Sequence, residues 1–325
     1  MSPRKCATRL FAITLGAPLV LWTAPLQAQD WPQKPVRMIV PIGPGSSPDV
    51  AARVFAERLA ARWGKPVIVE NRPGADGLTG TAAFAAAHDD HMLLFSPAAP
   101  LTVYPAIQDK LSYDPVHDIL PVSNAVETFG TVVVPNSLPI ASLSEFEKFA
   151  RERPGALNWA TGGGAFPILM EGFVKSASLQ MTQVPYSNQN LAIQDLAEGR
   201  VQVFATAMTA VLPLVQAGKL RVLTVTNKKR SPLWPDVPTA AQSGYPLLRF
   251  DGLIGLFASR GTSMDRRDRI ARDVQAIAAD REVTERLGKS GQIVAASTPA
   301  EFVSAIEDQR RSIANIVRLI GRSPK

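Results

Sequence analysis

Three segments of the chain place glycine and small residues directly after a predicted strand and before a predicted helix. They are residues 43–47, 73–77 and 161–164. In each, free backbone N–H groups and the positive end of a helix dipole would face the carboxyl edge of a sheet, which suits a bound anion. A single turn of this kind is also an ordinary connection. Three of them together indicate a ligand site at the sheet edge of an α/β fold.

An acid lies beside the first of these turns. Asp49 has two interpretations: it stabilises the start of the following helix and pairs with Arg53 four residues later, or it reaches the ligand and selects an ammonium group. In the first interpretation, Asp49, Arg53 and Glu57 share the solvent face of a helix over 48–63, capped by Ser47. Both interpretations stay open at this point.

No catalytic constellation stands out. The three histidines are His88, His91 and His117, and the 88–91 run (His-Asp-Asp-His) has no metal-site context, so a polar turn is favoured over a metal site. No G-x-S-x-G elbow occurs, and the 288–290 run (Gly-Lys-Ser) lacks the upstream glycine of a phosphate loop. We therefore expect no enzyme activity, no cofactor and no metal.

The N-terminus is typical of a secretory signal peptide. Three basic residues precede an apolar run over 10–22, and a small residue, Ala28, offers a cleavage point. The run is too short for a spanning helix. The only cysteine, Cys6, lies in this segment, so the mature chain would have no disulfide. Removal of residues 1–28 also lowers the formal net charge of +7 by three, and basic residues do not alternate with aromatic ones, so nucleic acid is not expected.

Length and pattern predict an α/β protein of two lobes. The 325 residues are 46% hydrophobic and 19% charged, which excludes disorder and supports a substantial core. Predicted strands alternate with helices, which is typical of a largely parallel sheet. The strands are expected at 36–41, 66–70, 92–95, 131–135, 157–161, 181–186, 201–206 and 220–226. Further helices are expected at 265–280, at 282–288 and after a capping box that begins at Thr298.

Two runs carry a family resemblance that extends over the mature chain. Residues 69–75 (Val-Glu-Asn-Arg-Pro-Gly-Ala) and 235–239 (Pro-Asp-Val-Pro-Thr) are similar to the extracytoplasmic solute receptors of tripartite tricarboxylate transporters, the Bug or TctC-type proteins. The resemblance implies a periplasmic binding protein of the Venus-flytrap type. Lobe one would comprise residues 30–127 plus 252–325, and lobe two residues 128–251.

The resemblance implies that a small carboxylate binds at the same three turns. Amides of lobe one, with hydroxyls such as Ser46, Ser47 and Thr79, would hold the carboxylate, and lobe two would contact the distal part. The full set of predicted ligand-binding residues is Gly43, Pro44, Gly45, Ser46, Ser47, Asp49, Gly74, Ala75, Asp76, Gly77, Thr79, Ser96, Thr161, Gly162, Gly163, Gly164, Ser187 and Thr206.

Several positions depart from the family pattern. Ser46 replaces a second glycine, Thr206 replaces an acid, and His91 replaces a tyrosine. Leu253 stands where an aromatic residue is frequent, and the second-lobe loop 163–168 lacks the usual serine and histidine. These changes affect the ligand set and leave the scaffold intact.

The resemblance implies membrane permease subunits as the partner and a monomeric receptor in the periplasm. A sensor kinase is the alternative partner, since a receptor of the same fold can signal through its closed form. A secreted hydrolase is a third class, but no serine lies in a recognisable nucleophile turn.

Overall fold

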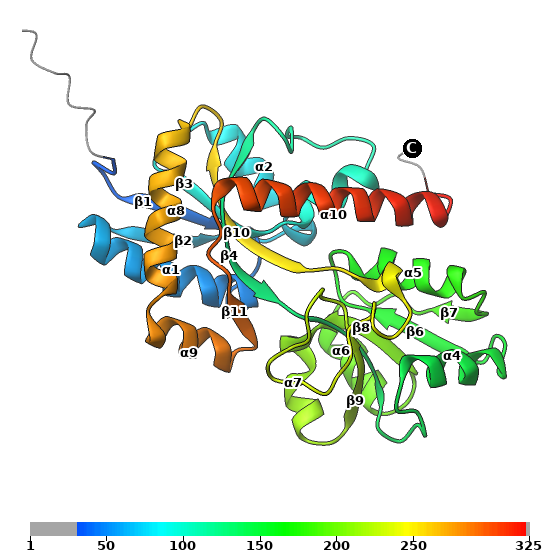
Figure 1. Cartoon of the computed structure of the whole chain (residues 1–325). Coiled ribbons are helices and arrows are strands. Elements are labelled where there is room, and N and C mark those ends of the chain that lie inside the picture. Colours follow the sequence, from blue (N-terminus) through cyan, green and yellow to red (C-terminus); the bar gives the residue numbers. More distant parts are fainter. Residues whose placement is uncertain (1–30, 323–325) are drawn as a thin grey trace, which may run out of the picture.

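Two mixed β-sheets, each covered by helices, form the two lobes of the molecule (Figure 1). The computed structural model describes residues 31–322, so the predicted signal peptide lies outside the described residues. The first lobe contains a six-stranded sheet in the order β11-β4-β10-β3-β1-β2, and the second a five-stranded sheet in the order β7-β6-β8-β5-β9. Within residues 31–322, no helix is both long and apolar enough to cross a membrane.

The elements of the first lobe come from both ends of the chain. They are β1 (Val36–Val40), α1 (Ser47–Trp63), β2 (Val67–Asn71), the 3-10 turn Ala75–Gly77, α2 (Leu78–Ala87), β3 (Met92–Pro97), α3 (Ala99–Thr102), the 3-10 turn Tyr104–Ala106, β4 (Ile119–Thr128), β10 (Gly252–Ser259), α8 (Met264–Ala278), α9 (Arg281–Lys289), β11 (Gln292–Val294) and α10 (Pro299–Leu319).

The elements of the second lobe come from the middle of the chain. They are β5 (Gly130–Pro135), α4 (Leu143–Arg151), β6 (Leu157–Thr161), α5 (Phe166–Ser176), β7 (Met181–Gln183), α6 (Gln189–Ala197), β8 (Val203–Ala207), α7 (Met208–Gln216), β9 (Leu220–Val225) and the 3-10 turn Pro246–Leu248.

The expectation of largely parallel sheets is wrong in part. Pairs β1·β2, β1·β3, β6·β7 and β6·β8 are parallel, whereas β10 pairs antiparallel with β3 and β4, β11 with β4, and β5 with β8 and β9. The strands β4, β10 and β11 were not predicted. Pro121 and Asn124 interrupt the apolar sequence pattern within β4, and Gly255 interrupts the pattern within β10. The glycine is required by packing, because a Cβ there would lie 2.3 Å from the ring of Phe302.

Helix ends follow the local sequence closely. Thr298 and Glu301 form the predicted capping box of α10, in which each side chain accepts a hydrogen bond from the other residue's backbone N–H. Gly64 ends α1 in the left-handed conformation, as expected for a glycine cap. These ends depend on neighbours in sequence, which is why they were predictable.

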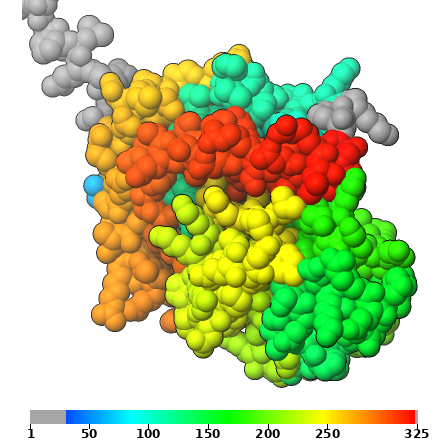
Figure 2. Space-filling model, turned by 45° about the vertical axis from the view of Figure 1, so that its right-hand side comes forward, coloured from blue at the N-terminus to red at the C-terminus, as the bar shows by residue number. Residues whose placement is uncertain are grey.

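The last helix packs against both lobes. Its first half contributes Phe302 and Ile306 to the first-lobe core, where Phe302 meets Phe257. Its second half, with Ile313 and Ile316, joins the core of the second lobe and contacts α5. In Figure 2 the red surface of α10 runs across the molecule and meets the green surface of the second lobe. The lobe boundaries at 127/128 and 251/252 stay a prediction, and α10 bridges the two units that they would define.

Two crossovers connect the lobes where β4 leads into β5 and where the chain returns to β10. The Asn227 side chain accepts a hydrogen bond from the Gly130 N–H (3.1 Å) and donates one to the Thr128 carbonyl (2.9 Å). A Cβ on Gly252 would lie 2.3 Å from Thr128 Oγ1, so only glycine lets the crossovers lie this close together. On α10, the buried Gln309 side chain donates to the Asp251 carbonyl at 2.7 Å. These contacts fix the hinge region.

Two carboxylates lie next to these crossovers. Burial raises the pKa of Glu127 above its ordinary value of 4.5, and the negative charge of Asp251 adds to the shift, although Lys229 and a hydrogen bond from Asn124 oppose it. A carboxyl group whose pKa is raised by folding destabilises the folded state once it ionises. The penalty therefore develops as the pH rises through about 4.5 and persists at neutral pH.

Replacement of this carboxylate tests the hinge electrostatics. Glu127→Gln keeps the oxygen that accepts from Asn124 but removes the charge, so we expect it to raise the free energy of unfolding by about 1 kcal/mol at pH 7. The gain should vanish below pH 4, where both proteins are uncharged at this position. Urea unfolding at several pH values measures it, with the exposed Glu152→Gln as the control. A gain that is equal at pH 4 and pH 7 would contradict the electrostatic explanation.

Candidate functional site

A cavity of about 930 Å³ lies between the two lobes. Helices of both lobes begin at its wall, among them α1 in the first lobe and α5, α6 and α7 in the second. Nine of the predicted binding residues line it: Gly43, Pro44, Gly45, Ser46, Ser47, Asp76, Gly163, Gly164 and Thr206. The predicted turns therefore converge on one space, which is the size of a small-molecule site.

The other nine predicted residues lie outside the lining. They are Asp49, Gly74, Ala75, Gly77, Thr79, Ser96, Thr161, Gly162 and Ser187. Ser96 is fully buried and donates to the carbonyl of Pro97. Gly162 is covered by neighbours, because a Cβ there would lie 2.3 Å from Gln189 Oε1 and 2.7 Å from Thr206 Oγ1. Gln189 and Thr206 line the cavity in place of the glycine.

The prediction that the Ser47 side chain caps α1 is wrong. The helix begins at Ser47, its N-cap residue is Ser46, and the Ser46 side chain makes no capping hydrogen bond. The hydroxyl oxygens of Ser46 and Ser47 are both shielded from solvent and have no hydrogen-bond partner among the described residues. Unpartnered polar groups of this kind are costly, and a bound oxygen acceptor would satisfy both hydroxyls.

The two hydroxyls stay unengaged because Asp49 organises the turn in their place. Its Oδ2 accepts from the Gly45 N–H (2.9 Å) and from Arg53 Nε (3.1 Å), and its Oδ1 accepts from Asn71 Nδ2 (2.8 Å). Asn71 also donates to the carbonyl of Ile42. Asp49 thus joins the turn to α1 and to the end of β2.

These contacts decide between the two interpretations of Asp49. The residue is only 3% exposed and does not line the cavity, so the structural interpretation holds and direct selection of an ammonium group does not. Burial alone would raise the pKa of Asp49, but hydrogen bonds from Arg53, Gly45 and Asn71 outweigh it and lower the pKa below 3.8. The expectation that Asp49 faces solvent is also wrong, because the residue is buried among Gly45, Arg53 and Asn71, which donate hydrogen bonds to its carboxylate.

The second turn has an unusual backbone. Ala75 and Asp76 have φ values of 46° and 52°, between Gly74 at 141° and Gly77 at 96°. The run places Asp76, a solvent-exposed residue, in the lining of the cavity. The Tyr104 hydroxyl donates to the Asp76 carbonyl at 3.1 Å and so supports this conformation. Burial raises the pKa of Tyr104, with a contribution from the Asp76 charge, so its hydroxyl remains a neutral donor.

Sequence reasoning missed residues of the second lobe. Gln189 and Asn190 begin α6, and Thr209 lies in the first turn of α7; all three line the cavity. Gln189 Oε1 accepts from Thr206 Oγ1 at 3.2 Å. One signal was present: Asn188 before α6 is a strong capping residue, and its side chain accepts from the Asn190 N–H. The Thr209 position gave no comparable signal.

The remainder of the wall is mainly apolar. It includes the side chains Phe166, Phe250, Leu253 and Ile254. Among the described lining residues, the charged ones are Asp76 and Lys289, and Lys289 is an exposed residue at the end of α9. The cavity is therefore a largely uncharged space in which polar groups are gathered at the helix starts.

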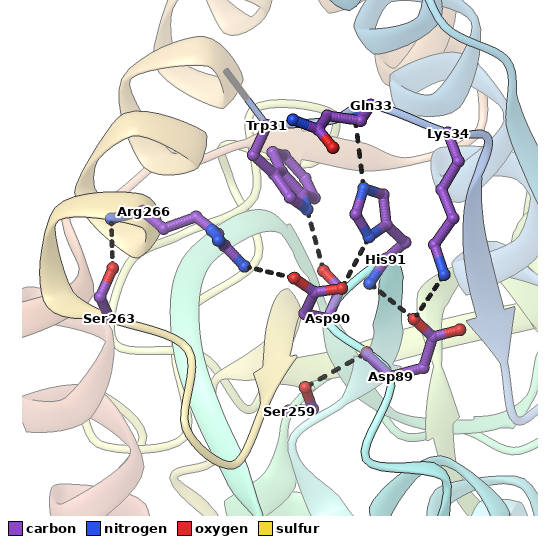
Figure 3. Close-up of polar contacts among 9 residues, drawn as sticks. All are labelled: Trp31, Gln33, Lys34, Asp89, Asp90, His91, Ser259, Ser263 and Arg266. Carbon is purple, nitrogen blue, oxygen red and sulfur yellow. Dashed lines mark hydrogen bonds and ion pairs between the residues drawn. The ribbon is translucent and has the colours of Figure 1, made fainter. Parts of the chain in front are cut away.

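The 88–91 run lies at the other end of β3, before the strand begins. Asp89, Asp90 and His91 have donor atoms within 4.8 Å of one another, but protein groups engage them (Figure 3). The Gln33 N–H donates to His91 Nε2 (3.2 Å), His91 Nδ1 faces Asp90 Oδ1 (2.7 Å), and Arg266 binds Asp90 Oδ2 (3.0 Å). The network ties the segment after the predicted leader to α8 and supports the polar-turn interpretation.

The two α/β lobes, the paired crossovers and the cavity between them define the class of periplasmic binding proteins. A family model described as the tripartite tricarboxylate transporter family receptor matches residues 51–321. The chain therefore belongs to this family, the TctC or Bug family, and the predicted resemblance is confirmed. The proteins of this family are receptors that bind solutes.

Individual relatives agree with this assignment. BugT of Bordetella pertussis is 32% identical over 306 residues, which cover 93% of this chain and 94% of that protein. A solved periplasmic transporter superimposes with a TM-score of 0.79 at 29% identity and covers 91% of this chain and 100% of its own. An R. palustris protein with adipate gives a TM-score of 0.80 at 27% identity, with the same coverage.

The Asp49 contacts lead to a stability prediction. Asp49→Ala removes three hydrogen bonds to a buried carboxylate, and we expect a loss of about 2 kcal/mol or more in the free energy of unfolding at pH 7. Because folding lowers the pKa of Asp49, its contribution is complete above the unfolded pKa of about 3.8 and declines as the pH falls through the folded pKa.

Urea unfolding of the variant at pH 7 and at pH 3 measures this effect. The control is Glu57→Ala on the exposed face of the same helix, whose ion pair with Arg286 is solvent-exposed and should contribute little. A wild-type level of stability for Asp49→Ala at pH 7 would show that the carboxylate does not organise the turn.

Proposed function

We propose that this chain is a periplasmic receptor that captures a small organic carboxylate and delivers it to the membrane permease of a tripartite tricarboxylate transporter. The observation that carries the proposal is the pair of shielded, unpartnered hydroxyls of Ser46 and Ser47, two residues at the start of α1 that line a cavity between the lobes. Two hydroxyl donors at the positive end of a 17-residue helix are suited to a carboxylate.

The lobe arrangement supports the transport role. A ligand favours the closed receptor only through contacts that the open form lacks, and this cavity offers contacts from α1 on one side and from Gln189, Asn190 and Thr206 on the other. Neutral donors predominate at the helix starts, so the ligand is bound by several modest interactions. Release to a membrane partner is then possible without breaking a buried ion pair.

Location and partner rest on the sequence and on the family. The leader predicted at residues 1–28 would direct the chain to the periplasm. Family membership supports a permease as the partner, since the family is described as a transporter receptor.

The test is direct binding. We expect native mass spectrometry of protein purified from periplasmic extract, without refolding, to detect an organic acid bound one to one. Isothermal titration with succinate, adipate, hexanoate, benzoate and terephthalate should then give saturable binding for at least one acid, with no turnover. If none binds and no organic acid co-purifies, the carboxylate receptor function is wrong.

A paired substitution links binding to the proposed residues. We expect Ser46→Ala/Ser47→Ala to weaken binding of the acid about tenfold or more, because each hydroxyl loses a hydrogen bond to a charged acceptor. The control is Ser304→Ala, an exposed serine of α10 outside the cavity. Unchanged affinity in the double variant, with the fold intact by circular dichroism, would exclude these hydroxyls as ligand donors.

A further inference from the structure

One acid faces the cavity at the boundary between the lobes. A Cβ built on Gly163 of the second lobe would lie 3.1 Å from Asp76 Oδ1 and 3.4 Å from Oδ2, so the first-lobe carboxylate lies directly against the second-lobe turn. Glycine at 163 leaves the room for it. Asp76 is solvent-exposed, and among residues 31–322 its carboxylate makes no ion pair and accepts no hydrogen bond, so no neighbouring side chain neutralises its charge.

The Asp76 carboxylate lies near a helix start that, without this acid, would favour an anionic group of the ligand. Gly163 and Gly164 precede α5, an 11-residue helix whose positive end faces the cavity. Asp76 therefore brings a fixed negative charge to the helix start that the second lobe offers. A second carboxylate of a ligand would meet like charge there and not a free helix end.

The rest of the second-lobe side offers only neutral donors, at the starts of α6 (Gln189 and Asn190) and α7 (Thr209). Phe166 and Phe250 line the cavity on this side, and Leu253 lies where the crossovers meet. The one described cation of the lining, Lys289, is exposed at the rim. A carboxylate moved from water against this wall loses hydration without gaining a cationic partner, which is unfavourable. An apolar group gains by the same transfer.

From these contacts we propose that the site selects a monocarboxylate with an apolar body and rejects dicarboxylates, and that Asp76 is the specificity-determining residue. The proposal rests on the carboxylate-receptor function proposed above. The single carboxylate binds at Ser46 and Ser47, and the uncharged end of the ligand points to the aromatic wall. This preference differs from that of the R. palustris relative, whose structure holds the dicarboxylate adipate.

The test compares acids that differ only at the distal end. Isothermal titration of the full receptor with hexanoate, adipate and 6-aminohexanoate, and with benzoate and terephthalate, gives the dissociation constants. We expect the monocarboxylate of each pair to bind at least tenfold more tightly than the matching dicarboxylate. The Asp76 charge attracts the ammonium group of 6-aminohexanoate and the aromatic wall disfavours it, so this acid tests which effect dominates. We expect the wall to dominate and hexanoate to bind more tightly.

A variant then assigns the preference to one residue. Asp76→Asn removes the charge and keeps the shape, and asparagine tolerates the positive φ of 52°. It should improve adipate or terephthalate binding at least fivefold and change monocarboxylate binding less than twofold. Asp109→Asn, an exposed acid of the same lobe outside the cavity, changes net charge equally and should alter neither.

The outcomes separate this proposal from the one on which it rests. A dicarboxylate that binds as tightly as its monocarboxylate partner, or an unchanged ratio in Asp76→Asn, overturns the selectivity and leaves the carboxylate receptor standing. Tighter binding of 6-aminohexanoate than of hexanoate also overturns it, since Asp76 would then pair with a cation. Failure of every carboxylate to bind contradicts the receptor function itself.

Discussion

The buried carboxylate of Asp49 is the interaction on which the first-lobe side of the cavity depends. It accepts hydrogen bonds from the turn, from α1 and from the end of β2, and it thereby holds three separate segments in one geometry. A carboxylate can accept several hydrogen bonds at once, whereas a serine cap satisfies only one backbone N–H. Because Asp49 supplies this order, the hydroxyls of Ser46 and Ser47 stay unpartnered in residues that line the cavity.

Charged side chains are distributed differently outside and inside the cavity. Acids and bases that stabilise the lobes are paired outside the cavity, as in the contacts among Asp90, His91 and Arg266. Inside it, the polar groups are mostly uncharged and belong to residues at helix starts. Asp76 and Lys289 are the described exceptions, and the Asp76 backbone, with φ at 52°, has the kind of local strain that folded proteins retain at functional positions.

Motion of the lobes is constrained by α10 as well as by the crossovers. The helix packs Phe302 into one lobe and Ile316 against α5 of the other, and its Gln309 binds the returning crossover. A closing movement therefore pivots about a region in which three segments meet. The contact of Asp76 with Gly163 also joins the two lobes, at the wall of the cavity.

The sequence by itself determined the parts of the molecule that depend on near neighbours. The capping box at Thr298, the glycine end of α1 and strands such as β6 over 157–161 could all be predicted, as could the family. The turns at 43–47, 73–77 and 161–164 were singled out for the same reason, since glycine and capping chemistry are local.

Only the tertiary structure decided which of those residues face the ligand space. The spacing of Asp49 from Arg53 and Glu57 is typical of the exposed face of a helix. The side chain is nevertheless buried, and it accepts hydrogen bonds from Asn71, 22 residues away, and from the Gly45 N–H. Asp76 meets Gly163 across 87 positions, and β4 and β10 pair although proline, asparagine and glycine interrupt their patterns. Such contacts join residues that are far apart in the sequence, and the local sequence around one does not predict the other. Burial and partners are set by packing between distant segments, which no local pattern encodes.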